Sequence, residues 1–112
     1  MNKLTTVLAG LLLCLSTNVF AEQHADAALE HATAAAAQGK AGNAGGLVDH
    51  AKMALDEAAT ASIVSKSITK NRLDEAGEFL QKAVHEGNLS HAPAATKLVN
   101  EAIAVLKSIP KK

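Results

Sequence analysis

Apolar residues recur every three or four positions in four separate segments of the chain, the spacing that places them on one face of an α-helix. The pattern predicts helices over about residues 24–38, 46–61, 71–86 and 92–109. No segment shows the alternation of apolar and polar residues that a half-buried β-strand requires. The chain is therefore predicted to be all-α.

The residues expected to face the interior are mainly alanines in the first predicted helix and a mixture of alanine with larger apolar residues in the other three. They are Ala25, Ala28, Leu29, Ala32, Ala35, Ala36, Leu47, Ala51, Leu55, Ala58, Leu73, Ala76, Leu80, Val84, Ala95, Leu98, Val99, Ala102, Ile103 and Leu106. Because alanine buries little apolar area, the predicted core is thin.

Glycine, proline and asparagine mark the expected ends of these helices. Gly39 and Gly42 are expected to end the first helix, and Gly87 the third. Pro110 is expected to end the fourth, and Asn43 is the expected N-cap of the second. Short loops between consecutive helices force them to run antiparallel. The prediction is an up-down-up-down four-helix bundle built from two repeated helical hairpins.

The connection between the hairpins, residues 62–71, is rich in Ser, Thr and β-branched residues, which have weak helix propensity. Ile63, Val64 and Ile68 indicate that it still packs, as a distorted continuation of the second helix. A monomer is expected. If the connection is instead one long helix, the hairpins 22–61 and 72–109 exchange between two chains and form a swapped dimer.

The two halves of the chain align with each other without a gap when one is shifted by 48 positions. The matched pairs include Asp26–Asp74, Ala28–Ala76, Ala35–Ala83, Gly39–Gly87, Ala44–Ala92 and Ala54–Ala102. Such self-similarity indicates one structural unit used twice. It also means that each position in one half can be interpreted from its counterpart in the other half.

The first 21 residues are predicted to be a secretory signal peptide that is cleaved after Ala21. Lys3 gives a basic start, and residues 4–15 form an apolar run too short to span a membrane comfortably. Val19-Phe20-Ala21 has small residues at the −3 and −1 positions of the cleavage site. The mature protein, residues 22–112, is therefore expected to be periplasmic or secreted, with no membrane segment.

Composition argues against several classes of function. After Ala21 the chain has ten Lys or Arg residues and eleven Asp or Glu residues, so it lacks the basic field that nucleic acid requires. It has no Cys in that part, which excludes disulfides and thiolate metal sites. It also has no Trp or Tyr on which nucleic-acid bases could stack. Bulky apolar surface for haem is scarce, and no covalent haem motif is present. No nucleophile–base constellation, phosphate loop or His-Glu-x-x-His spacing indicates an enzyme.

The repeat indicates where two of the five histidines point. At the 48-residue shift His31 aligns with Phe79 and His50 with Leu98, so both histidines are expected to be at least half buried. They also face each other across the first hairpin, offset by about 4–5 Å of helix rise. The sequence predicts a facing His31–His50 pair. Such a pair is a candidate metal site, since imidazole is the commonest metal ligand, and the alternative is two satisfied interface residues.

Further ligand types flank this pair in the sequence. Glu30 and Asp49 are its immediate neighbours, and Met53 lies one helical turn beyond His50 on the same face. Imidazole with carboxylate suits Cu(II) or Zn(II), whereas imidazole with thioether suits Cu(I). Both ligand sets stay open.

His24 is the third residue of the predicted mature chain. A free amine, two deprotonated amides and this imidazole form a square-planar ligand set that suits Cu(II) or Ni(II). This site depends on cleavage after Ala21. Glu57 is expected to face His24 across the first hairpin.

Two more histidines flank the turn of the second hairpin, together with Glu86. His85 ends the third predicted helix, where its charge complements the helix dipole. His91 is expected to be a cap or an exposed turn residue. A weak metal site at this turn is the alternative.

In order and spacing these features resemble the small metal-binding protein family, which consists of secreted, periplasmic copper-binding four-helix bundles. The resemblance rests on His24-x-Asp26-x-Ala28-x-x-His31-Ala32, Gly39-Lys40-Ala41-Gly42, Leu47-x-x-His50-Ala51-Lys52, Leu73-Asp74-Glu75-Ala76, Ala83-Val84 through Gly87 to His91, Ala95-Thr96-Lys97 and Glu101-Ala102-Ile103. It covers the whole predicted mature chain and implies copper binding, with other divalent metals tolerated. The histidines that match family positions are His24, His31, His50 and His91.

The chain also departs from the family pattern, because family members are typically far richer in histidine. The positions where histidine is expected but absent are Gln38, Asn43, Asp56, Phe79, Glu86 and Leu98. The second hairpin has thus lost most of its expected ligands, and the first is expected to hold the main site.

The sequence therefore predicts a periplasmic small metal-binding protein that buffers or sequesters copper, with zinc or nickel as alternatives. The candidate ligands are His24, His31, His50, His91, His85 and Met53. No enzymatic activity, haem or nucleic-acid partner is expected. The alternative function is a helical interaction or chaperone-like envelope module that has lost most of its metal ligands.

Overall fold

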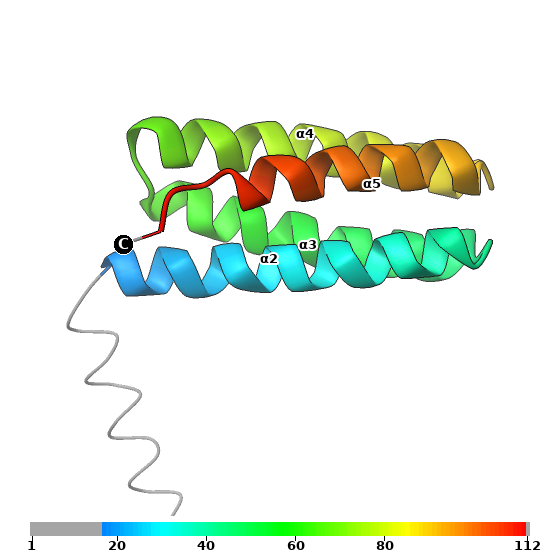
Figure 1. The fold of residues 1–112 in the computed structure, drawn as a ribbon, viewed down its shortest axis with the longest axis horizontal. Helices are drawn as coiled ribbons and strands as arrows, with labels where there is room; N and C mark the ends of the chain where they lie inside the picture. Colours follow the sequence, from blue (N-terminus) through cyan, green and yellow to red (C-terminus); the bar gives the residue numbers. More distant parts are fainter. Residues whose placement is uncertain (1–16, 112) are drawn as a thin grey trace, which may run out of the picture.

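The computed structural model describes residues 17–111, which form an all-α four-helix bundle (Figure 1). The helices are α2 (Thr17–Lys40), α3 (Ala44–Val64), α4 (Ser67–Asn88) and α5 (Ala92–Lys107). Each packs against the next in the chain, and α2 also packs against α5. The predicted fold class is confirmed. The apolar run of the predicted signal peptide, residues 4–15, lies outside the described residues.

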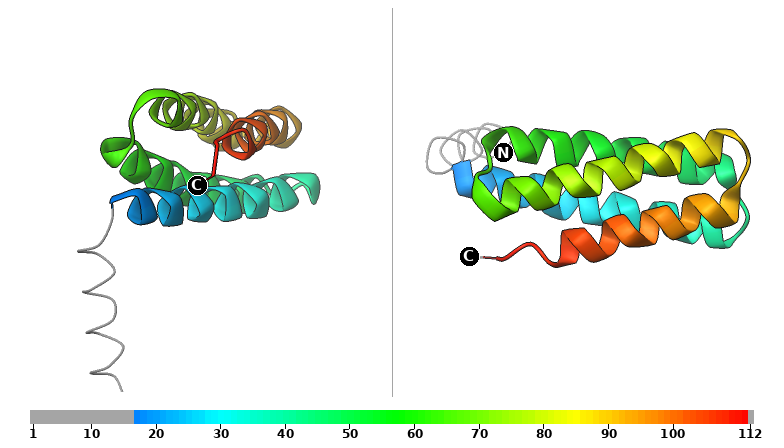
Figure 2. Two further views of the ribbon diagram at one scale, coloured as in Figure 1. Left: turned by 60° about the vertical axis from the view of Figure 1, so that its left-hand side comes forward. Right: turned by 90° about the horizontal axis from the view of Figure 1, so that it is seen from above.

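The two hairpins form two layers. In Figure 1, α2 and α3 make one layer, and α4 and α5 the other. Both hairpin turns lie at one end of the bundle, while the α3–α4 link lies at the opposite end with the two ends of the described chain. Figure 2 shows the same arrangement from two further directions. No helix within residues 17–111 is long and apolar enough to cross a membrane.

The core is built mainly from alanine, as predicted. The largest fully buried side chains are Leu47, Leu73, Leu80 and Val99, and most other buried residues are alanines. Within the four predicted helices, every residue expected to face inward is either buried or packed against the buried cluster. The prediction that the connection packs through Ile63 and Ile68 is wrong, because these side chains are 81% and 52% exposed. Helical spacing of apolar residues therefore located the interior of the helices but not the contacts of the connection between the hairpins.

Two buried glycines show that the sequence repeat is also a packing repeat. A Cβ atom on Gly39 would overlap Oγ1 of Thr96, and one on Gly87 would lie 2.5 Å from Cγ2 of Val48. Thr96 and Val48 are themselves 48 positions apart. Each hairpin thus contributes a glycine that admits the equivalent residue of the other hairpin, an arrangement with approximate two-fold symmetry.

Each of these glycines is the last-but-one residue of its helix, close to the predicted end. α2 continues to Lys40 and α4 to Asn88. The residue after α2 that adopts a left-handed conformation is Gly42, with φ of 81°. Asn43 is the N-cap of α3, as predicted, and its side chain accepts a hydrogen bond from the backbone N–H of Gly46 at 2.9 Å.

The link between the hairpins is much shorter than the predicted connection over residues 62–71. Only Ser65 and Lys66 separate α3 from α4, and Ser67 has a left-handed φ of 54°. α2 likewise begins before the predicted start of its helix, so the predicted cleavage position after Ala21 lies inside α2. The two hairpins are not joined by one continuous helix, and they pack against each other within one chain.

Candidate metal centre

His31 of α2 and His50 of α3 face each other across the first hairpin, as the repeat predicted. Their ring centroids are 6.3 Å apart, and their planes are inclined by 26°. Both residues are half-buried. In the second hairpin the equivalent positions hold Phe79 and Leu98, which pack against the core.

One ring nitrogen of this pair has no partner. The Nδ1 atom of His50 is buried and makes no hydrogen bond within the described residues. A buried polar atom without a partner costs about 1–3 kcal/mol. In the neutral tautomer that carries its proton on Nε2, this atom has a lone pair of the kind that binds metal ions. The His31–His50 pair therefore fits a metal ion by the chemistry of its donors.

In the described part of the chain, the carboxylates considered for this site are not grouped with the pair. Glu30 and Asp49 are exposed, and Met53, one helical turn beyond His50 in α3, is 41% exposed. Within residues 17–111, no group of three or more His, Cys, Asp or Glu side chains is arranged to hold a metal ion. The pair thus supplies two nitrogen-bearing rings and no third ligand of those types.

His24 contacts the residue expected to face it. Its Nδ1 pairs with Oε1 of Glu57 from α3, and its ring meets the ring of Phe20 edge-on, with centroids 4.3 Å apart. His24 lies two turns from His31, or about 10 Å along α2. The structure therefore places His24 in a separate contact with a carboxylate, apart from the His31–His50 pair.

The turn of the second hairpin brings one predicted histidine to a carboxylate and leaves the other apart. His91 Nδ1 lies 2.9 Å from Oε1 of Glu86, whereas His85 is exposed. At the same place in the first hairpin, Asn43 donates a hydrogen bond to the side chain of Gln38 at 2.8 Å. Because both turns carry this contact, the His91–Glu86 pair serves to bridge its turn.

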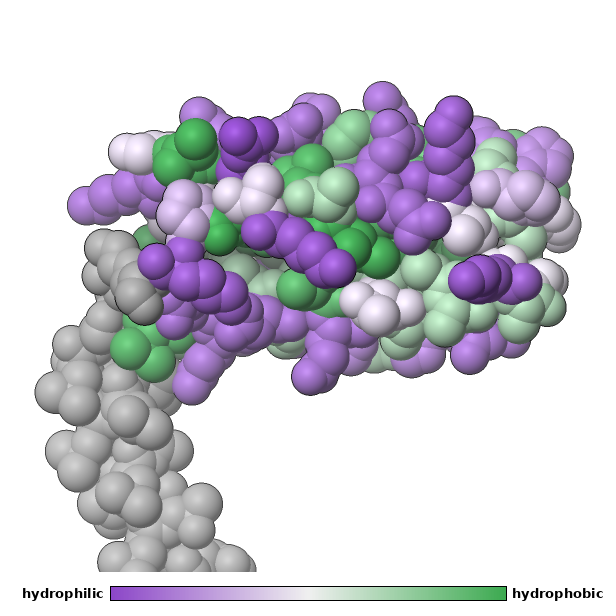
Figure 3. Space-filling model, in the orientation of Figure 1, coloured by the Kyte–Doolittle hydropathy of each residue, from purple (hydrophilic) through white to green (hydrophobic). Residues whose placement is uncertain are grey.

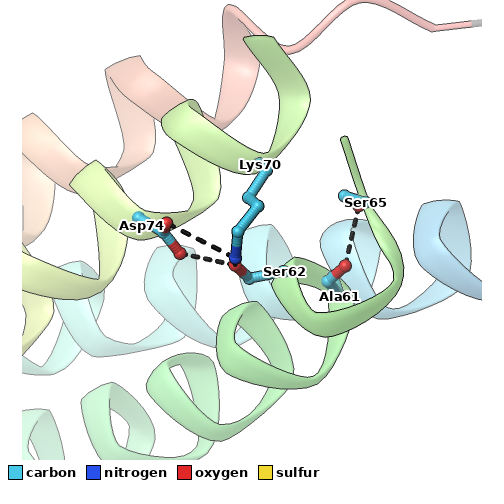
Figure 4. A network of polar contacts seen from close by, with 5 residues as sticks. All are labelled: Ala61, Ser62, Ser65, Lys70 and Asp74. Carbon is cyan, nitrogen blue, oxygen red and sulfur yellow. Dashed lines mark hydrogen bonds and ion pairs between the residues drawn. The ribbon is translucent and has the colours of Figure 1, made fainter. Parts of the chain in front are cut away.

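A polar cluster beside the hairpin link was not predicted from the sequence. The buried Ser62 hydroxyl donates a hydrogen bond to Asp74 Oδ1 at 2.5 Å and accepts one from Lys70 Nζ at 3.0 Å (Figure 4). The nearby Ser65 hydroxyl donates to the Ala61 carbonyl at 2.7 Å. The cluster joins the end of α3 to the start of α4. One indication in the sequence pointed to a structural role for Asp74: it aligns with Asp26 at the 48-residue shift.

Asp26, the counterpart of Asp74 in the repeat, also makes a polar contact with another segment of the chain. It pairs with Lys111, which follows α5, and this hydrogen bond raises the pKa of the Lys111 amine. Charged side chains cover much of this face, and apolar side chains show in the seam between α2 and α5 (Figure 3). Two surface grooves along this seam are lined by residues that include none of the histidines.

Comparison with known proteins agrees with the resemblance seen in the motifs. The model of the small metal-binding protein family matches residues 1–109, which include both hairpins. No curated protein matches the chain significantly. A match over this length covers the fold, both turns and all five histidines. The chain belongs to the small metal-binding protein family.

Proposed function

We propose that this protein binds copper in the periplasm, with the His31–His50 pair as its main site and buffering or sequestration as its role. Membership of the small metal-binding protein family indicates a metal-binding function and points to binding rather than catalysis. The periplasmic location rests on the predicted signal peptide. The observation that carries the site is the unpartnered, buried Nδ1 of His50, whose ring centroid lies 6.3 Å from that of His31.

The remaining candidate ligands form weaker sites in this proposal. His24 and His91 each pair with a carboxylate, so a metal ion there must compete with an existing contact. His85 is exposed and would bind an ion only loosely, together with its neighbours at the turn. Met53 lies one turn from His50 and is a soft ligand for copper. Zinc and nickel are alternative ions at all these positions.

The second hairpin supplies a matched control for the main site. The double variant His31→Phe/His50→Leu installs the side chains that the repeat carries at these positions. We expect it to fold and to be more stable than the wild type by about 1–2 kcal/mol, because it removes an unsatisfied buried nitrogen. Chemical denaturation of the metal-free proteins measures this difference.

Calorimetric titration with Cu(II), Zn(II) and, without oxygen, Cu(I) tests binding on the processed protein. We expect saturable binding by the wild type and loss of the tightest site in His31→Phe/His50→Leu. The exposed-histidine variant His85→Ala should keep that site. Equal binding by the wild type and the double variant would contradict the site assignment. Absence of binding of any metal would favour the helical interaction module instead.

A further inference from the structure

We propose that the end of the bundle that carries the α3–α4 link docks on an anionic phospholipid surface. This link end consists of residues 17–25, 58–73 and 104–111, which are the ends of all four helices together with the link and the tail after α5 (Figure 1). The proposal goes beyond metal binding and does not depend on it. It rests on the charge of the link end, on its exposed apolar side chains, and on the poor fit of a second copy of the chain.

Positive charge is concentrated at the link end. It carries five Lys or Arg residues and a single acidic residue, Glu22, whereas residues 26–57 and 74–103 carry four Lys and ten Asp or Glu. A chain of nearly balanced charge therefore has one basic end. Each basic side chain near an anionic bilayer strengthens binding by about fivefold. The basic residues of the link end are Lys66, Lys70, Arg72, Lys107 and Lys111.

Lys66 and Lys107 are available to a lipid phosphate. Both are exposed, and neither forms an ion pair within residues 17–111. The ion pair of Arg72 with Glu75 has an N–O distance of 3.7 Å, and both side chains are at least 40% exposed. Because exposed ion pairs of this kind contribute little, a lipid phosphate can take the place of the carboxylate.

Two large apolar side chains protrude beside these charges. Ile63 lies two residues before the link and is 81% exposed, and Ile68 lies two residues after it and is 52% exposed. Figure 3 shows apolar side chains between hydrophilic ones at this end of the bundle. Apolar side chains that enter the headgroup region, flanked by lysines, are the combination with which peripheral proteins bind anionic membranes.

A second copy of the chain does not fit the link end. Two link ends that face each other would bring like charges together. In the described residues after Ala21, the other exposed large apolar residues are Met53, within α3, and Leu89, at the opposite end of the bundle. These two offer no joint apolar face for both isoleucines. A lipid surface supplies phosphate and acyl chains together and requires no matching shape.

Co-sedimentation with vesicles tests the proposal on the processed, metal-free protein. We expect binding to vesicles of phosphatidylglycerol and phosphatidylcholine in equal amounts, weaker binding at high salt, and no binding to phosphatidylcholine alone. Lys66→Gln/Lys107→Gln should bind about 30-fold more weakly. Lys40→Gln/Lys97→Gln removes the same charge away from the link end and should weaken binding by less than about threefold.

The apolar contribution is tested in the same way. Ile63→Ser/Ile68→Ser should lose about tenfold in affinity, whereas Met53→Ser/Leu89→Ser, which alters exposed apolar residues elsewhere, should bind like the wild type. Circular dichroism verifies that all variants fold. Failure of the wild type to bind anionic vesicles overturns the proposal, and so does an equal loss in the two lysine variants. Self-association of the wild type that Ile63→Ser/Ile68→Ser abolishes would assign the link end to a second copy and also overturn it.

Discussion

The two hairpins have the same architecture but differ at the two positions that we propose bind a metal ion. Both bury alanines at equivalent positions, both place a glycine against the other hairpin, and both bridge their turn with a side-chain contact. At the two large half-buried positions, the first hairpin carries His31 and His50 where the second carries Phe79 and Leu98. The comparison teaches that alanine and glycine determine how the helices meet, while these two positions accept either large apolar residues or histidines.

The largest effect is expected from giving the second hairpin the histidine pair. In Phe79→His/Leu98→His we expect a second metal equivalent, because the helices hold the two positions in the same relation. We also expect a loss of about 2–4 kcal/mol of stability, since bulky apolar side chains are replaced by partly buried polar ones. Titration gives the stoichiometry, and denaturation gives the stability.

The neighbouring exposed pair Glu78 and Lys97 provides the control for this graft. Glu78→His/Lys97→His adds two histidines to the surface of the same hairpin without disturbing the core. It should bind no tight second ion and lose little stability. A folded Phe79→His/Leu98→His protein that binds no second ion would show that the hairpins are not equivalent at this place.

The second-largest effect is expected on stability, from substitution of the two glycines at which the hairpins approach each other closely. Gly39→Ala and Gly87→Ala should each lose about 1–2 kcal/mol, because overpacking outweighs the gain in helix propensity. Gly77 is the control, since a Cβ there would meet Leu55 at an ordinary 3.5 Å. Gly77→Ala should be stabilising by up to about 1 kcal/mol. Thermal unfolding of the three variants measures these differences, and a stabilised Gly39→Ala or Gly87→Ala would disprove the close approach.

A smaller effect distinguishes the two equivalent aspartates. Asp74→Ala should cost about 1–2 kcal/mol, because it leaves the buried Ser62 hydroxyl without its acceptor. Asp26→Ala should cost less than about 0.5 kcal/mol, since its pair with Lys111 is exposed. Denaturant titrations of both variants at neutral pH provide the comparison, and equal losses would refute it.

The Asp26–Lys111 pair also has a defined dependence on pH. Its hydrogen bond raises the pKa of Lys111 above the ordinary value of 10.5. The contribution of the pair is therefore complete below that ordinary value and is lost as the pH rises through the raised pKa. Any difference between the wild type and Asp26→Ala should accordingly disappear in strongly alkaline solution.

The smallest effect is expected at the turns. Glu86→Gln/His91→Asn gives the second turn the side chains of the first, so stability should stay within about 0.5 kcal/mol. Binding at the His31–His50 pair should not change, because the turn lies at the end of the other hairpin. Titration and thermal unfolding both report on this variant. A marked loss of metal binding would place His91 in the main site and contradict its role at the turn.

The interior and the histidine pair could be predicted from the sequence because both depend on periodicity. Regular spacing located the alanine core, and the alignment of His31 with Phe79 and of His50 with Leu98 indicated that both rings face inward. The structure confirms this facing arrangement. Metal binding by the pair stays a prediction, since it depends on affinity rather than on placement.

Helix ends and the polar cluster at the link were harder to predict because they depend on contacts between distant segments. Gly39 and Gly87 each lie one residue before the end of a helix, but their second role, close packing against the other hairpin, is not visible in local sequence. Ser62 has weak helix propensity, yet its burial and its hydrogen bond to Asp74 extend α3 beyond the predicted end. Local propensity does not register such tertiary contacts.

Both rings of the candidate metal centre belong to the first hairpin, so a bound metal ion would restrain only the separation of α2 from α3. An ion held between His31 and His50 opposes any opening that separates α2 from α3, by an amount that grows with the free ion concentration. It makes no bond to the second hairpin, so sub-global opening that parts the two layers proceeds with the ion still bound. Hydrogen exchange should therefore show that metal protects one hairpin as a unit, while the seam between α2 and α5 keeps its own stability.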